Sequence, residues 1–193
     1  MRNKDLTQLI DALEKRYHLQ ASLSNFLKQT LRRKVYYKNE VILKKGAAPE
    51  KMYILYEGIA LGYYFNEDNE KIGSWFCAQQ QFIGNIKTVI RGKGSDEQIV
   101  LLKGSVAYYL DIEKAKEWIE YIMENRSLLM QSLHDREVLL NNRNQCRDYT
   151  NNLKKIDAFE IRHPLLIDAL PQEFLASYLG MTTVWLNIQL GNR

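Results

Sequence analysis

The sequence has few of the residues that form disulfide bonds or bind metal ions. It contains two cysteines and three histidines among 193 residues. Cys77 and Cys146 lie far apart and outside any C-x-x-C spacing, so we expect reduced thiols. An iron–sulfur cluster held by cysteines needs about four ligands, and the histidines show no H-x-x-x-H or H-E-x-x-H spacing. We therefore expect no metal site and no bound cofactor.

Long apolar runs are also missing. No segment approaches the roughly 20 apolar residues that span a bilayer, and the N-terminal residues Met1–Asp5 are polar, without the apolar core of a signal peptide. We expect no contact with membranes and a location in the cytoplasm. With 46% hydrophobic and 26% charged residues, the composition is typical of a soluble protein with one large domain or two small ones.

The motifs of common enzymes are absent as well. The chain has no nucleophile elbow, no P-loop and no H-E-x-x-H motif. Its clustered carboxylates, such as Glu67, Asp68 and Glu70, fall in a segment of turn residues, where solvated surface groups are common. We therefore expect that the protein is not an enzyme.

The start of the chain is basic and helical. Residues 1–45 hold eleven Lys or Arg against four Asp or Glu, whereas residues 146–193 hold five of each. Apolar residues with helical spacing predict an amphipathic helix over 5–16 and a second, shorter one over 22–31. A DNA-binding domain is normally the basic part of a protein, and here the C-terminal segment is not.

Between residues 35 and 110 the pattern changes to short strands. Runs rich in β-branched and aromatic residues alternate with turn residues such as Gly, Asn and Asp. Short strands at near-regular spacing predict a small all-β sandwich or barrel. The expected strands are 35–37, 41–43, 52–55, 59–65, 72–76, 99–102 and 106–110.

Glycines mark the most informative part of this β-rich region. Gly46 and Gly58 flank the strand expected at 52–55, and glycines at such points usually need a positive φ or room for a close neighbour. Further on, Phe82-Ile83-Gly84-Asn85 carries apolar anchors into a glycine turn, where backbone N–H groups can converge on an anion. The spacing resembles the cyclic-nucleotide-binding β-roll of the bacterial Crp/Fnr transcription regulators, in which an F-x-G-E turn opens the phosphate-binding cassette.

The charges that hold a cyclic nucleotide in that family are not retained. The resemblance implies a Glu after the glycine, for the ribose hydroxyl, and an Arg some ten residues later, for the phosphate. Here Asn85 takes the first place and Gly94-Ser95-Asp96-Glu97 the second. An unpaired buried anion is costly, so we expect no binding of cyclic AMP; Arg91 or Lys93 either supplies a substitute cation or lies on a solvated loop. The candidate ligand residues are Phe82, Ile83, Gly84, Asn85, Arg91, Ser95 and Asp96.

A long helix is expected after the strands, because no Gly or Pro occurs between Asp111 and Pro164. Five apolar residues fall on the a and d positions of one heptad frame, and Arg126 and Arg136 take the two remaining seam positions. This pattern predicts a helix over 113–145 that pairs along one stripe. The partner is either a second protomer, which we favour, or only the chain's own β-domain. The five residues are Ile119, Ile122, Leu129, Leu133 and Leu140.

The last segment has the pattern of two helices joined by a tight turn. One helix is expected to end at Gly180, and Thr182 can cap the next. This is the form of a helix-turn-helix, whose second helix enters the major groove of DNA. Residues 175–182, L-A-S-Y-L-G-M-T, resemble the corresponding turn of Crp/Fnr regulators.

The expected recognition helix is poor in charge. Family members usually carry an Arg near its middle and a following β-wing, whereas here Ile188-Gln189-Leu190 takes the basic region and the sequence stops at Arg193. Few phosphate contacts mean low affinity at physiological salt, so either residues beyond Arg193 have been lost or the domain no longer binds DNA. Amides can address adenine edges, and the candidate DNA-reading residues are Thr182, Thr183, Asn187 and Gln189.

The order of these parts predicts an α+β protein. We expect a jelly-roll-like β-roll with N-terminal helices over 1–112, a long dimerisation helix over 113–145 and a helix-turn-helix domain over 146–193. The resemblance implies a homodimer that binds an effector in the β-roll and DNA through paired recognition helices. Two functions stay open. One is a DNA-binding regulator that senses a small ligand other than cyclic AMP, or none; the other is an effector-binding or dimerisation module whose helix-turn-helix no longer binds DNA.

Overall fold

The computed structural model describes residues 2–78, 80–84, 88, 94–112 and 126–191. The chain divides into two compact units, the first made of Met1–Leu61 and Phe76–Arg136, the second of Gly62–Trp75 and Glu137–Arg193. The sequence analysis placed domain boundaries after residues 112 and 145, according to the expected function of each segment. These boundaries stay a prediction. Within the described ranges, no helix is long and apolar enough to cross a membrane.

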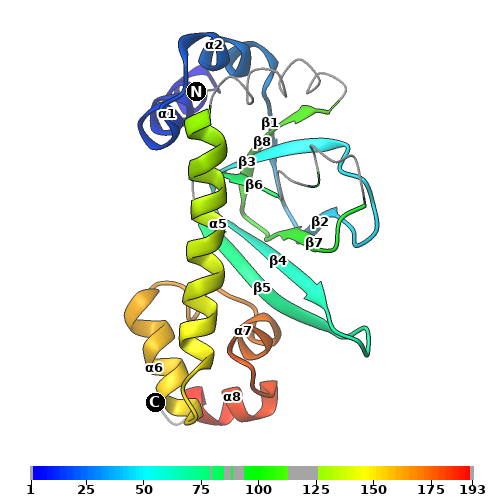
Figure 1. Cartoon of the computed structure of the whole chain (residues 1–193), viewed down its shortest axis with the longest axis vertical. Coiled ribbons are helices and arrows are strands. Elements are labelled where there is room, and N and C mark those ends of the chain that lie inside the picture. Colours follow the sequence, from blue (N-terminus) through cyan, green and yellow to red (C-terminus); the bar gives the residue numbers. More distant parts are fainter. Residues whose placement is uncertain (1, 79, 85–87, 89–93, 113–125, 192–193) are drawn as a thin grey trace. The chain divides into compact units, whose positions relative to one another are not determined.

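Eight described strands form two antiparallel sheets of four strands each, which confirms the predicted α+β class with a β-roll (Figure 1). The first sheet has the order β1 (Arg32–Val35), β8 (Val106–Asp111), β3 (Lys51–Glu57), β6 (Gln81–Ile83). The second has the order β2 (Glu40–Leu43), β7 (Gln98–Leu101), β4 (Ile59–Phe65), β5 (Lys71–Ala78).

Strand β3 lies at the centre of the first sheet. Ile54 on this strand is opposite Tyr108 of β8 on one side and Phe82 of β6 on the other. Only the two ends of β3, Lys51 and Glu57, are exposed, and the neighbouring residues Ile54 and Leu55 are both buried although successive side chains of a strand point to opposite faces. The register with β8 shifts just before Gly58, where φ is +98° and Ser105 leaves no room for a Cβ atom. The sequence pattern correctly predicted a special glycine at this turn.

Two N-terminal helices, α1 (Arg2–Tyr17) and α2 (Ala21–Thr30), pack against the apolar face of this sheet. Both were predicted from the apolar spacing, and their inward residues Leu9, Leu13 and Leu27 have no exposed surface. The long helix α5 (Arg126–Arg147) contributes its first turns to the same core. The fully or mostly buried residues of this cluster are Leu9, Ile10, Leu13, Tyr17, Leu23, Leu27, Met52, Ile54, Tyr108, Leu110 and Leu128.

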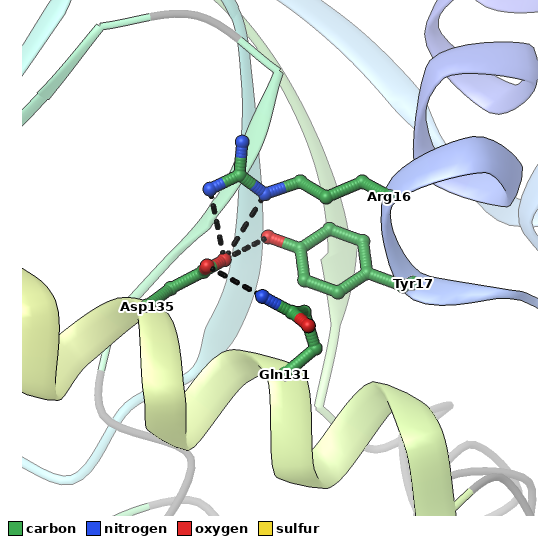
Figure 2. A network of polar contacts seen from close by, with 4 residues as sticks. All are labelled: Arg16, Tyr17, Gln131 and Asp135. Atoms are coloured by element: carbon green, nitrogen blue, oxygen red, sulfur yellow. Dashed lines mark hydrogen bonds and ion pairs between the residues drawn. The ribbon is translucent and has the colours of Figure 1, made fainter.

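A polar network joins the end of α1 to α5 within the first unit (Figure 2). Asp135 Oδ2 accepts hydrogen bonds from Arg16 Nε at 3.0 Å and from the Tyr17 hydroxyl at 3.2 Å, and its Oδ1 accepts one from Gln131 Nε2 at 3.0 Å. The Ser127 hydroxyl donates to the backbone carbonyl of Tyr17 at 2.9 Å. Burial and the Asp135 charge raise the pKa of Tyr17 far above its usual value. Tyr17 is therefore a permanent hydrogen-bond donor to this carboxylate.

Replacing Asp135 by Ala is expected to lower the free energy of unfolding by about 2 kcal/mol, because three donors lose one shared acceptor. Arg16 is partly solvated and contributes little to this loss, whereas the mostly buried Tyr17 hydroxyl contributes most. Denaturant unfolding followed by circular dichroism measures the change. His134→Ala, at an exposed neighbouring position of α5, is the control and should change stability little. Equal losses in the two variants would contradict the assignment.

The second unit holds the β4–β5 hairpin residues 62–75, the C-terminal part of α5, and the helices α6 (Asn152–Arg162), α7 (Gln172–Leu179) and α8 (Thr183–Gly191). An aromatic series connects the hairpin to α7 and α6. Tyr63 contacts Phe174 edge to face at 5.2 Å between ring centroids, and Phe174 stacks on Tyr178 at 5.8 Å. Tyr178 in turn contacts Phe159, at 5.9 Å. These rings form the centre of the unit.

Candidate functional site

The glycine after β6 has a positive φ, and the anion-binding role expected of this turn stays a prediction. Gly84 has a φ of +122°, and Ile99 Cδ1 on β7 lies 4.0 Å from the position that a Cβ would take there. Two backbone hydrogen bonds join the turn at Gly46 to the segment just before β7. The Gly46 N–H donates to the Ser95 carbonyl at 2.7 Å, and the Ser95 N–H donates to the Ala47 carbonyl at 2.9 Å. The positive φ at Gly46, +80°, allows this approach.

An ion pair lies beside this loop. Glu97 is only 8% exposed, and its carboxylate accepts a hydrogen bond from the Arg136 guanidinium of α5. The Glu97 N–H donates to the buried Ser95 hydroxyl at 3.1 Å. Negative charge at 96–97 was expected to oppose a phosphate, and the structure shows in addition that an internal cation holds Glu97. Sequence reasoning missed this pair, although Arg136 is one of only two charged residues among the apolar a and d positions of the heptad frame.

The predicted ligand residues are placed in different surroundings. Phe82 contacts Tyr17 edge to face at 5.2 Å and belongs to the core under α1. Ile83 is buried and Ser95 is 3% exposed, whereas Asp96 is solvent-exposed. Asn85 and Arg91 lie outside the described residues. A ligand role for this set stays a prediction.

A cavity of about 260 Å³ lies elsewhere in the first unit, between β2, β3 and the loop that joins them. Its walls carry both signs of charge, from Lys44, Lys51 and Glu50, beside the Tyr53 ring. Burial, with nearby carboxylates such as Glu40, raises the pKa of Tyr53 to about 12. None of the predicted ligand residues that the structure describes lines this cavity.

The turn between α7 and α8 has the predicted capping geometry. Gly180 ends α7 in the left-handed conformation, with φ +71° and ψ +46°, and its N–H donates to carbonyls of the last turn. The Thr182 hydroxyl accepts a hydrogen bond from the Trp185 N–H at 3.2 Å, as expected of an N-cap. Ala176 is 1% exposed. A short, fixed turn therefore sets the angle between the two helices.

The β4–β5 hairpin is fastened to α7 within the second unit. The Ser177 hydroxyl accepts a hydrogen bond from the Gly73 N–H at 2.9 Å and donates one to the Phe174 carbonyl at 2.9 Å. A Cβ on Gly73 would lie 2.9 Å from that carbonyl oxygen and 3.0 Å from the Phe174 ring. Gly73 therefore has a packing reason to be glycine, and no sequence pattern indicated this long-range contact.

The predicted DNA-reading residues lie at the start and along the surface of α8. Thr182 and Asn187 are exposed, and Thr183 and Gln189 are half-buried. Leu186 is fully buried and holds the helix against its unit. Neither the first nor the last turn of α8 carries a charged residue.

The predicted dimer residues fall partly on the described portion of α5. Leu129 packs against the core cluster of its own chain, and Leu133 and Leu140 are half-buried. Met130, three residues before Leu133, is 65% exposed. Ile119 and Ile122 lie outside the described residues. Pairing along this helix stays a prediction.

The two cysteines are free and buried. Burial raises the pKa of Cys77 to about 12 and also raises that of Cys146. Thiolate is the reactive form of cysteine, so both side chains are protonated at neutral pH and shielded from reagents. Among the described residues, no group of three or more His, Cys, Asp or Glu side chains is arranged to hold a metal ion.

His163 gives the second unit a pH-dependent stability. The residue follows α6 and contacts Phe159 at 5.1 Å; burial, and then the Arg162 charge, lower its pKa below the usual 6.5. As the pH falls, the unfolded chain therefore binds a proton before the folded one. The stabilising contribution of neutral His163 is complete above pH 6.5 and declines as the pH falls below that value.

Melting temperatures of wild type and His163→Gln, measured at several pH values on either side of 6.5, test this expectation. The wild-type melting temperature should fall more steeply on acidification than that of the variant. Parallel profiles would show that His163 makes no such contribution.

Comparisons with known proteins agree on the fold. No protein-family model matches the sequence, and no curated protein matches it. FixK2 of Bradyrhizobium japonicum matches with a TM-score of 0.67 and 12% identity over 84% of this chain and 83% of that chain. The c-di-GMP-responsive global regulator CLP of Xanthomonas campestris matches with a TM-score of 0.69 and 10% identity over 90% of this chain and 91% of that chain.

A third match is confined to part of its protein. The regulatory domain of Toxoplasma gondii PKA, in a co-crystal with cAMP, gives a TM-score of 0.54 and 15% identity over 70% of this chain and 50% of that chain. Identities this low establish the fold alone. The fold is the cyclic-nucleotide-binding type of β-roll followed by a helical segment, the arrangement that the Crp/Fnr-family regulators FixK2 and CLP share with this chain.

Proposed function

We propose that the protein is a dimeric Crp/Fnr-type transcription regulator that binds DNA through α7 and α8 as a helix-turn-helix. One observation carries the proposal: the capped turn at Gly180 and Thr182 follows a β-roll and a long helix in the same chain. The match to the global regulator CLP over most of both chains supports it. Such a protein acts in the cytoplasm and has no catalytic role.

The β-roll senses a small ligand other than cyclic AMP, or none. The pair of Glu97 and Arg136 supports this part of the proposal, because an entering phosphate would compete with Glu97 for the guanidinium. Removing one partner from a mostly buried ion pair is costly. A thermal-shift screen of nucleotides and small anions tests it, and strong stabilisation by cyclic AMP would contradict it.

The dimer forms along α5. Leu133, Leu140 and the exposed Met130 offer an apolar stripe on the described part of the helix. Leu133→Glu combined with Leu140→Glu should convert the dimer to a monomer, because charges at the seam lose their hydration on pairing. Analytical ultracentrifugation measures the change. Leu153→Glu, at an exposed position of α6, is the matched control and should stay dimeric; a dimer in both variants would contradict the assignment to α5.

DNA binding is tested by gel-shift titration of the full chain against genomic fragments of the source organism. We expect retarded fragments at about 50 mM salt and weaker binding at about 200 mM salt, because phosphate contacts release counterions. Asn187→Ala should weaken the selected complexes, whereas Asn141→Ala, an exposed amide on α5, should not. No salt-sensitive binding to any fragment would refute the DNA-binding half of the proposal.

A second candidate function is a dimerisation or effector-binding module that does not bind DNA. It is favoured by one observation, the lack of Lys and Arg in α8, since phosphate contacts dominate DNA affinity. Its signature is a dimer that survives deletion of residues 146–193 and that retards no genomic fragment. The gel-shift titration therefore separates the two functions.

A further inference from the structure

The solvent-exposed face of α8 carries apolar side chains, whereas a recognition helix of the Crp/Fnr type usually carries an Arg. Val184 and Ile188 are 71% and 53% exposed, and the exposed Asn187 lies on the same side, at helical spacings of three and four residues. The opposite side is anchored by Leu186, which is fully buried. Two large aliphatic side chains one turn apart are thus presented to solvent, with an amide beside them.

The uncharged face limits which base pairs α8 can read. In the major groove, guanine is recognised chiefly by Arg or Lys and the cytosine amino group by Glu or Asp. Residues 183–191, T-V-W-L-N-I-Q-L-G, contain none of these four types. Thymine, in contrast, presents a methyl group, and adenine presents the pair of edge atoms that an amide side chain can bind together.

We infer that α8 reads A·T base pairs, with Val184 and Ile188 packed against thymine methyl groups and Asn187 bonded to an adenine edge. This inference rests on the proposed DNA binding and specifies its target. The spacing fits: four residues of α-helix rise about 6 Å, close to two base-pair steps of about 3.4 Å each. The two aliphatic side chains therefore reach methyl groups about two steps apart.

The chemistry of the target also explains how the helix can work without a cation. Burial of a methyl group against an aliphatic side chain stabilises the complex through the hydrophobic effect, which is non-directional and insensitive to salt screening. A recognition helix of this kind obtains base discrimination from apolar contact and one amide, and leaves phosphate contacts to other elements. The helix α8 itself should therefore contribute little to the salt dependence of binding, which the phosphate contacts of other elements determine.

The test compares thymine with uracil, which lacks only the methyl group. Two libraries of short duplexes with a randomised centre, one built with thymine and one with uracil, are each selected with the full-length protein at about 50 mM salt. The thymine library should yield sites rich in A·T pairs. The same sites rebuilt with uracil should bind about fourfold more weakly for each methyl group contacted, the effect of burying one such group.

A variant assigns the effect to the two aliphatic side chains. Val184→Ala combined with Ile188→Ala keeps a helix-forming surface and should reduce the preference for thymine over uracil nearly to unity. The control Leu165→Ala removes an aliphatic group of the same unit that is still more exposed, at 85%, and should keep the preference. Equally tight binding to the thymine and uracil sites would overturn the inference while the proposed function stands. A preference for thymine that is unchanged in the double variant would do the same. Failure to bind either library would overturn both.

Discussion

Replacing Phe174 by Ala is expected to lower the free energy of unfolding of the second unit by about 4 kcal/mol, the usual cost of removing a buried aromatic ring. Phe174 is 1% exposed and contacts both Tyr63 of the hairpin and Tyr178 of its own helix. Its ring also packs against Gly73. Removing it leaves a cavity at the point where the hairpin meets α7, and the surrounding backbone is too constrained by the Ser177 hydrogen bonds to collapse into it.

Denaturant unfolding combined with hydrogen exchange of peptides from α6 and α7 measures this loss, because hydrogen exchange reports the second unit separately. The matched control is Tyr149→Ala, which removes an aromatic ring that is 41% exposed in the same unit and should change stability little. A small effect of Phe174→Ala, comparable to the control, would show that the aromatic series does not hold this unit together. DNA binding should weaken in parallel, since the first helix of the proposed helix-turn-helix depends on the same ring.

Replacing Glu97 by Gln is expected to cost the first unit about 3 kcal/mol, because breaking a mostly buried ion pair leaves an uncompensated charge. The side chains of Glu97 and Arg136 are 11% and 22% exposed, so solvent screens the remaining guanidinium only in part. The neutral amide retains the shape of the carboxylate, which separates the loss of charge from a loss of packing.

A double-mutant cycle with Arg136→Met isolates the pair, since it removes the cation and keeps an apolar stem. The double variant should recover much of the stability lost by Glu97→Gln, because the buried charge is then gone. Asp96→Asn, at the exposed neighbouring carboxylate, is the control and should be close to neutral. Additive effects of the two substitutions would show that the pair contributes no coupling energy.

Much of the β-roll could be predicted because its signals are local. Gly46, Gly58 and Gly84 all have positive φ values, which glycine adopts without a steric cost. The strand expected at 59–65 agrees with β4, and most other strands were found within one or two residues of their ends. Apolar spacing alone also located α1 and α2. These features are determined by neighbouring residues, which a sequence displays directly.

Two strands of the first sheet escaped this reasoning for a physical reason. β1 begins at Arg32, before the expected start at 35, because three of its four residues are exposed and the strand shows no apolar alternation. Its position depends on pairing with β8 and on ion pairs such as Arg32 with Asp111. β6 covers only three residues and is held by β3. Short strands supported by distant partners leave little pattern in the sequence.

The candidate site was predictable in outline and not in its contacts. The capped turn at Gly180 follows from residue types at fixed offsets, and the structure confirms it. The partnership of Glu97 with Arg136 and that of Gly73 with Ser177 join residues far apart in the chain. Only tertiary structure brings such groups together: the charge of Arg136 among apolar heptad positions was the sole indication of the first pair, and the second left no sign in the sequence.

The most direct test of the account is to recover genomic fragments bound by the full-length protein and to sequence them. A dimer with paired recognition helices should enrich one motif with two inverted half-sites about one helical turn of DNA apart. Enrichment should fall when Asn187 is replaced by Ala. A protein that enriches no sequence over the input library, at low as well as moderate salt, would contradict the proposal that this chain is a DNA-binding regulator.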